Sequence, residues 1–196
     1  VEYWEEWTAA PGGTWNVNSL MIRVTHSNSG PAAANNITAG RIVVTHAAPA
    51  TTTSIANGNW NAAGTWNNGV PDLTKVAVVD GETVTVSTTT DTGYQLTVSS
   101  GTLTISDTQL LTIGEGGVQI NGGTVTLDLR GDLTCTGGDT TVASGATLNI
   151  GSNNVKEAIY TATGRTFTSA GTVVINSSGA PALTCATINC TAGSVT

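Results

Sequence analysis

The chain has 196 residues and a formal net charge of −7, and 39% of its residues are hydrophobic while only 10% are charged. Its six Lys and Arg residues are too few to neutralise the phosphates of a nucleic acid, which excludes a nucleic-acid-binding protein. The apolar runs are far shorter than the roughly 18 residues that span a bilayer, and the many alternating Val, Ile and Leu residues exclude a disordered chain.

The N-terminal part, residues 1–56, is expected to form a small β-rich module. It opens without the basic flank and the apolar core of a signal peptide. Its aromatic residues Trp4, Trp7 and Trp15 are candidate contacts for a second subunit or for a glycan. The scarcity of Lys and the abundance of Thr, Asn and Gly favour an extracellular or cell-surface protein.

A period of about 20 residues begins inside this module. The segment Ile-Arg-Val-Thr-His at 22–26 returns as Ile-Val-Val-Thr-His at 42–46. Residues 47–54 are small or polar and include Pro49, a composition that predicts an extended linker. We therefore expect a second domain to start near residue 57.

A repeated phrase organises residues 57–196, which we expect to form one parallel β-solenoid with coils of about 20–22 residues. Each copy is a glycine followed by an alternating strand, and the copies begin at Gly81, Gly101, Gly123, Gly145 and Gly171. One face of each strand points inward in such a fold, so apolar residues stack in columns and the intervening Thr side chains face outward. The residues expected to point inward are Val84, Val86, Leu103, Ile105, Val125, Leu127, Leu148 and Ile150.

Glycine-rich pairs between these strands predict corners with positive backbone φ, at 116–117, 121–123 and 137–138. The alternative fold is a β-sandwich, whose short strands also recur at close spacing. A sandwich needs neither a fixed period nor the same phrase in every copy. The repeat therefore favours the solenoid.

One longer phrase resembles a known group of proteins. It runs Trp60-x5-Trp66-Asn-Asn-Gly-Val-Pro71-Asp72 and is followed by Val-Ala-Val-Val at 76–79. This resembles the opening coils of bacterial surface β-helix proteins, namely autotransporter passengers and haemagglutinin-like adhesins. The resemblance implies an extracellular, right-handed parallel β-helix that serves adhesion or scaffolding and has no required catalytic site. The chain departs from the pattern by its short length and by a second copy of the phrase at residues 7–16.

Trp60 and Trp66 are expected to cover the bare end of the first coil, because large aromatic side chains can keep water off an apolar column. Stacking on sugar rings is the functional alternative for the same two residues.

The acidic residues offer little catalytic chemistry. Asp128 and Asp132 flank Arg130, which predicts a charged outer corner with a local ion pair. Glycoside hydrolysis needs two carboxylates that face each other across a cleft, and a lyase needs more basic residues than Arg130, Lys156 and Arg165 provide. We expect no enzyme.

No cofactor or metal is expected from the sequence. Calcium is the one ion considered, since the protein is acidic, but the fragment 137–139 falls short of a calcium-binding repeat. His26 and His46, one period apart, are interpreted as outward ladder positions because further ligands are lacking. The number of cysteines is odd, so the chain could hold either one disulfide and one free thiol or three buried thiols; the cysteines are Cys135, Cys185 and Cys190.

These observations predict a structural protein that assembles end to end with copies of itself. The strand pattern continues through residues 182–196, and an uncapped coil presents unpaired N–H and C=O groups to another chain. Head-to-tail contacts of this kind would form a fibre or a surface layer. The alternative is a glycan- or host-binding module of a longer adhesin, and a second alternative is carbohydrate cleavage by Asp128 and Asp132.

Overall fold

The computed structural model describes residues 48–88, 90–127, 131–151, 157–176, 182–191 and 194–195. Most of the expected N-terminal module, residues 1–47, therefore lies outside the described residues.

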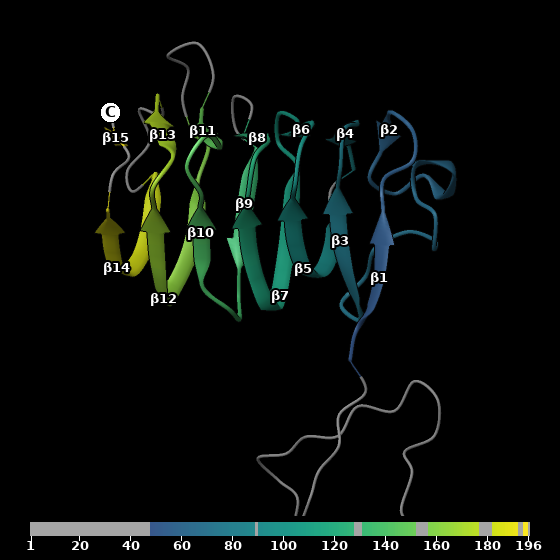
Figure 1. The fold of residues 1–196 in the computed structure, drawn as a ribbon, viewed down its shortest axis with the longest axis horizontal. Coiled ribbons are helices and arrows are strands. Elements are labelled where there is room, and N and C mark those ends of the chain that lie inside the picture. The colour runs from purple at the N-terminus through teal and green to yellow at the C-terminus, as the bar shows by residue number, and fades with distance from the viewer. Residues whose placement is uncertain are drawn as a thin grey trace, which may run out of the picture. The chain divides into compact units, whose positions relative to one another are not determined.

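The described chain is a parallel β-solenoid built from two sheets, as the repeat predicts (Figure 1). The larger sheet has eight strands: β1 (Ala50–Thr53), β3 (Lys75–Val79), β5 (Asp91–Val98), β7 (Leu110–Ile120), β9 (Asp132–Cys135), β10 (Thr140–Val142), β12 (Tyr160–Ser169) and β14 (Leu183–Cys190). The smaller sheet has seven: β2 (Gly58–Asn59), β4 (Thr83–Val86), β6 (Thr102–Ile105), β8 (Thr124–Leu127), β11 (Thr147–Ile150), β13 (Thr172–Ile175) and β15 (Ser194–Val195). Neighbouring strands pair in parallel, so the sandwich alternative is wrong.

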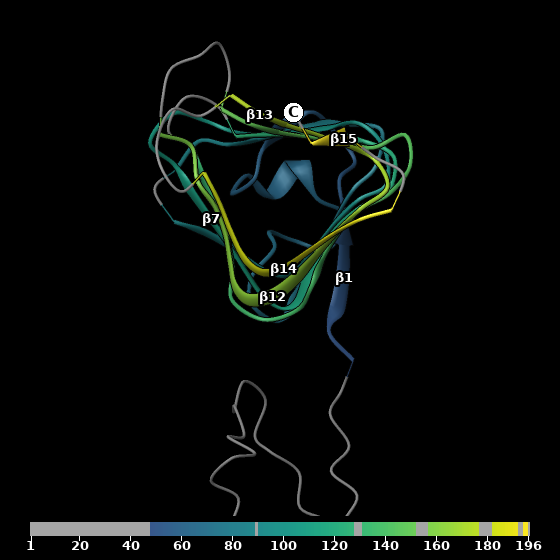
Figure 2. The ribbon, with the colours of Figure 1, turned by 90° about the vertical axis from the view of Figure 1, so that its left-hand side faces the viewer.

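Each coil has a three-sided outline when viewed along the solenoid (Figure 2). The smaller sheet forms one side. The long strands of the larger sheet bend in the middle and form the other two sides. Register shifts lie in the pairing of β5 with β7, between Gly93 and Gln95, and in the pairing of β12 with β14, between Ala162 and Thr166. A bulge bends a strand without ending it, which lets one strand turn a corner.

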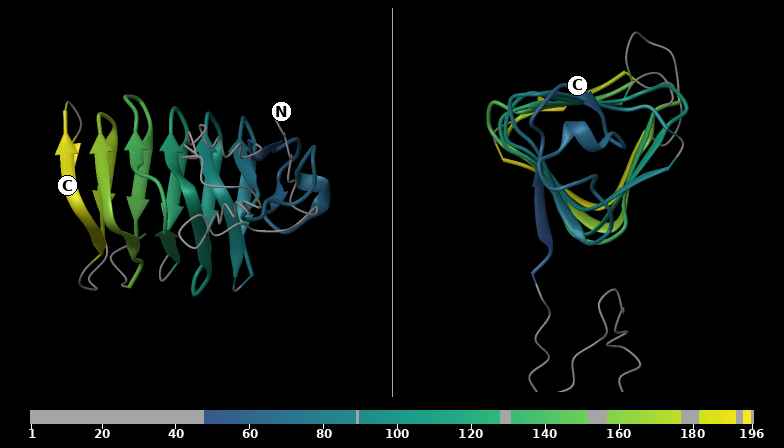
Figure 3. Two further views of the ribbon diagram at one scale, coloured as in Figure 1. Left: turned by 90° about the horizontal axis from the view of Figure 1, so that it is seen from below. Right: turned by 90° about the vertical axis from the view of Figure 1, so that its right-hand side faces the viewer.

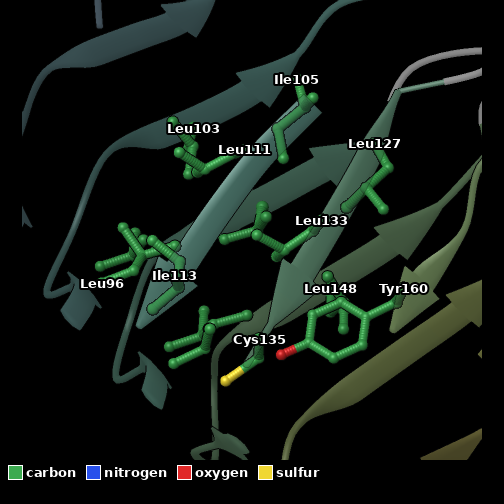
Figure 4. Packing of buried hydrophobic residues seen from close by; sticks show 14 of the residues in the cluster. Leu96, Leu103, Ile105, Leu111, Ile113, Leu127, Leu133, Cys135, Leu148 and Tyr160 are labelled. Atoms are coloured by element: carbon green, nitrogen blue, oxygen red, sulfur yellow. The ribbon is translucent and has the colours of Figure 1, made fainter. Parts of the chain in front are cut away.

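The five glycine-led phrases become β4, β6, β8, β11 and β13, which stack in register in the smaller sheet. All eight residues expected to point inward are fully buried. Figure 4 shows four of them meeting side chains of the larger sheet that include Leu96, Leu111 and Leu133; the four are Leu103, Ile105, Leu127 and Leu148. The alternation of apolar residues and Thr thus places one continuous apolar column inside the solenoid.

The corner glycines act for two different reasons. Gly117 has a φ of 75°, as expected for the corner at 116–117, and Gly101, which opens a repeated phrase, has a φ of 79°. Gly123 and Gly137 lack a positive φ, so the positive φ predicted for the segments 121–123 and 137–138 is wrong for these two residues. At Gly137 an added Cβ would overlap the Glu115 backbone of the preceding coil. Close approach of adjacent coils, rather than backbone torsion, requires glycine there.

The solenoid also extends further toward the N-terminus than expected. Residues 50–53, expected to be a linker, form β1 and pair with Lys75–Val78 of β3. In the described part of the chain, no helix has the length and hydrophobicity needed to cross a membrane.

Candidate functional site

The two ends of the described solenoid differ, and the first end is closed by two tryptophans. Trp60 is fully buried and Trp66 is 3% exposed, and their rings meet edge to face with centroids 5.2 Å apart. Trp66 Nε1 donates a hydrogen bond to Trp60 O at 2.7 Å, and Trp60 Nε1 donates to Thr92 O at 3.2 Å. Both indole N–H groups are therefore satisfied in the core, as burial requires.

This arrangement confirms that Trp60 and Trp66 cover the apolar column, and it rules out their use as exposed sugar platforms. The 3-10 turn η2 (Ala63–Thr65) connects them and lies within the outline of the first coils when the solenoid is viewed end on (Figure 3, right).

The outer edge of β1 is also covered, by the residues that follow η2. Ser54 forms an antiparallel bridge with Trp66, and Asn67 N donates to Thr53 O at 3.0 Å. The Asn67 side chain accepts from Thr53 N at 2.9 Å, and Asn68 Nδ2 donates to Thr51 O at 3.1 Å. Backbone groups that would otherwise accept another strand are thus occupied from within the chain.

The opposite end, formed by β14 and β15, has no such cover among the described residues. β14 pairs with β12 alone and β15 with β13 alone, so each is an edge strand of its sheet. Four β14 residues lie opposite residues of β12 that are fully buried. These pairs are Leu183 with Tyr160, Cys185 with Ala162, Ile188 with Phe167, and Cys190 with Ser169.

The row formed by Leu183, Cys185, Ile188 and Cys190 is called here the terminal row. It continues the inward columns but has no following coil in the described chain. Ile188 is 51% exposed, whereas Phe167, its partner one coil earlier, is fully buried. The terminal row therefore combines an apolar surface with a strand edge whose outward N–H and C=O groups have no ladder partner in the described chain.

Behind the terminal row, the core contains a buried polar contact. Tyr160 Oη and Thr140 Oγ1 lie 2.6 Å apart, and Tyr160 packs edge to face on Phe167. Burial raises the pKa of Tyr160 far above its usual value. Cys135 Sγ donates to Gly138 O at 3.2 Å, and burial raises the pKa of this thiol. These groups are held neutral and serve packing. All three cysteines are free thiols.

The predicted contact residues Trp4, Trp7 and Trp15 lie outside the described residues, as do His26, His46, Asp128 and Arg130. Asp132 is described, and its Oδ1 accepts a hydrogen bond from Ile159 N at 3.0 Å. Asp139, from the fragment considered for calcium, accepts from Thr166 N at 2.9 Å. Both carboxylates join one coil to the next. The described residues contain no cluster of three or more His, Cys, Asp or Glu side chains that could hold a metal.

One part of this site was missed by sequence reasoning, and another was predicted only in general. The covering of β1 by Asn67 and Asn68 follows from an antiparallel return of the chain, and the Asn-Asn-Gly segment at 67–69 is a turn signal that could have indicated it. The open last coil was expected from the strand pattern of residues 182–196, but the terminal row has the same alternation as the inner coils, so no local signal distinguishes its individual residues.

Comparison with known proteins leaves these features as the only guide to function. No family model matches the chain, and neither a curated protein nor a solved structure is significantly similar to it.

Proposed function

We propose that this chain is an extracellular, non-enzymatic structural protein whose copies assemble head to tail through the terminal row. The observation that carries the proposal is the half-exposed Ile188 in a column that is otherwise buried. Added strands would pair with the edge of β14 and bury this row, as in other cases of β-strand addition.

The energetics favour a partner that supplies both strands and apolar side chains. Each ladder hydrogen bond contributes about 1 kcal/mol net, and full burial of an exposed Ile contributes about 1.5–3 kcal/mol. Association itself costs about 4–15 kcal/mol, so strand pairing along the eight residues of β14 needs the apolar contribution of the terminal row.

The partner segment we propose is residues 1–47 of the next copy. Strand β1 of the next copy cannot itself pair with β14, because Thr65–Gly69 covers the outer edge of β1. The preceding segment contains the alternating stretches at 22–26 and 42–46 and the residues Trp4, Trp7 and Trp15. Such a contact joins two different surfaces, so it propagates as a filament rather than closing as a dimer.

The roles of the carboxylates support a structural rather than an enzymatic function. Asp132 and Asp139 each accept a backbone hydrogen bond from the following coil, and Asp91 accepts a side-chain hydrogen bond from Thr88 Oγ1 at 3.0 Å. The Asp132 and Asp139 carboxylates thus connect adjacent coils.

The test is sedimentation and electron microscopy of the full chain over a range of concentrations. We expect linear oligomers that grow with concentration, and we expect Ile188→Lys to remain monomeric because a charge in the terminal row cannot be buried. Leu73→Lys is the matched control, since Leu73 is a similarly exposed apolar residue, at 55%, outside the terminal row. A wild-type chain that stays monomeric at every concentration, or equal assembly by both variants, would contradict the proposal.

A further inference from the structure

The outer face of the smaller sheet carries a two-dimensional array of threonines. The strands β4, β6 and β8 each place Thr at two outward positions, with an inward Val or Leu between them. One column consists of Thr83, Thr102, Thr124, Thr147 and Thr172, and the other of Thr85, Thr104 and Thr126, followed by Asn149 and Val174. We call this surface the threonine face.

The spacing of the threonine face is regular in both directions. Adjacent parallel strands lie about 4.8 Å apart, and outward residues two positions apart on one strand are separated by about 6.6 Å. The pairings from β4 to β13 carry no register shift, whereas those of β5 with β7 and of β12 with β14 in the larger sheet do. The strands of the smaller sheet superpose along one side of the three-sided outline in Figure 2.

The side chains of this face are also held in place. Thr is branched at Cβ and therefore stiff at χ1, and most of these threonines are half-buried against their neighbours in the column. A ligand that binds here would cost little side-chain entropy. The result is a fixed lattice of alternating methyl and hydroxyl groups.

The face is uncharged although the protein is acidic. Strands β4, β6, β8, β11 and β13 contain no charged residue, and Glu82 stands just outside β4. A neutral, rigid surface complements a neutral partner and offers no counter-charge to an ionic one. A single sugar or peptide does not repeat in two dimensions, so the partner that fits is itself a periodic, uncharged solid surface.

From this geometry we propose that the threonine face binds ice. The repeats across and along the strands approximate those of the oxygen atoms on a prism face of hexagonal ice. Ordered water over the hydroxyl and methyl lattice would therefore join a growing crystal with little rearrangement. The proposal concerns a side of the solenoid, so it is independent of the end-to-end assembly described above.

The larger sheet provides a matched control. It carries one outward Thr column of its own, Thr92, Thr112, Thr134, Thr161 and Thr184. The residues two positions before and after Thr112 are Leu110 and Gly114, so no second threonine stands beside Thr112 on its strand. A bulky substitution at Thr112 should leave ice binding intact, while the same change at Thr104 should disrupt it.

The experiment measures incorporation of the purified full chain into a slowly growing polycrystalline ice hemisphere, together with inhibition of ice recrystallisation. We expect the wild type and Thr112→Tyr to enter the ice, and Thr104→Tyr to be excluded like a non-binding protein. Far-UV circular dichroism and urea midpoints establish that both variants are folded. Exclusion of the wild type from ice, or equal incorporation of the two variants, overturns the proposal.

A gain-of-function variant sharpens the same test. Asn149 interrupts the second column, and its Nδ2 donates to Thr126 Oγ1 at 3.3 Å. Asn149→Thr would extend the complete Thr-x-Thr pattern from three strands to four, so we expect stronger inhibition of recrystallisation than in the wild type. A reduced inhibition would count against the threonine lattice as the binding surface.

Discussion

The first and the last described coils end the same apolar column in opposite ways. At the first coil, Trp60 and Trp66 fill the end of the column and the following residues satisfy the edge of β1. At the last coil, Ile188 is half exposed and β14 keeps an edge without a partner in the described chain. A parallel solenoid has two such ends, and here one is closed by side chains of its own.

The difference shows that an end of the solenoid is closed only when both its apolar side chains and its unpaired backbone groups are covered. The indole rings cover the apolar side chains, while Asn67 and Asn68 occupy the backbone groups. Neither device alone would close the first coil, because an exposed ladder and an exposed apolar column each invite another strand.

The largest change in the free energy of unfolding is expected when the tryptophan cover of the first coil is removed. Trp60→Ala removes a fully buried ring and one hydrogen bond to Thr92, so we expect the free energy of unfolding to fall by about 3–5 kcal/mol. Ile188→Ala, at the open end, should cost less than about 1 kcal/mol because the side chain is already half exposed. Urea denaturation measures both, and similar losses would show that the two ends are not different.

A smaller effect is expected from uncovering the β1 edge. The double variant Asn67→Ala/Asn68→Ala removes two side-chain hydrogen bonds, which should lower the free energy of unfolding by about 1–3 kcal/mol. It should also give the solenoid a second open edge and increase self-association measured by sedimentation. Asn61→Ala is the control, because Asn61 is exposed beside the same cover. Unchanged association of the double variant would mean that the asparagines do not protect the edge.

The smallest effect is expected at Asp91, the residue before Thr92, whose carbonyl accepts the hydrogen bond from Trp60 Nε1. Burial raises the pKa of Asp91, although the Thr88 hydroxyl opposes this shift. An acid whose folded-state pKa is raised destabilises the fold when ionised, and this cost disappears as the pH falls through the folded and then the unfolded pKa. Asp91→Asn should therefore stabilise the protein near pH 7 and not near pH 3.

Urea midpoints at the two pH values check this difference. An equal gain at both would show that packing, rather than ionisation, controls the effect.

Much of the solenoid could be predicted because its signal is local and repeated. The alternation in Val84 to Val86 and in Leu148 to Ile150 depends only on the period of a strand, so the inward columns were predicted correctly. The path of β7 through Gly114–Gly117 was not, because glycine suits both a corner and a bulge. The small and polar composition of residues 47–54 predicts a linker, whereas pairing with β3 makes residues 50–53 the strand β1.

The candidate site was less accessible to sequence reasoning. The cover role of Trp60 was predicted from residue size, but the contacts of Asn67 and Asn68 depend on a return of the chain that no periodicity encodes. Ile188 has the same pattern as Phe167, and only the absence of a described neighbour distinguishes them. A position in a stack is a tertiary property that the alternation of a single strand does not contain.

The in-register stacking of β4, β6, β8, β11 and β13 has a consequence for how such a protein can change over time. Each coil contacts mainly the coils directly before and after it, so duplicating one repeat lengthens the molecule by about 4.8 Å without disturbing the others. Gain or loss of gene segments that each encode one repeat would therefore change the length of the solenoid in fixed steps, while Trp60 and Trp66 continue to cover the first coil.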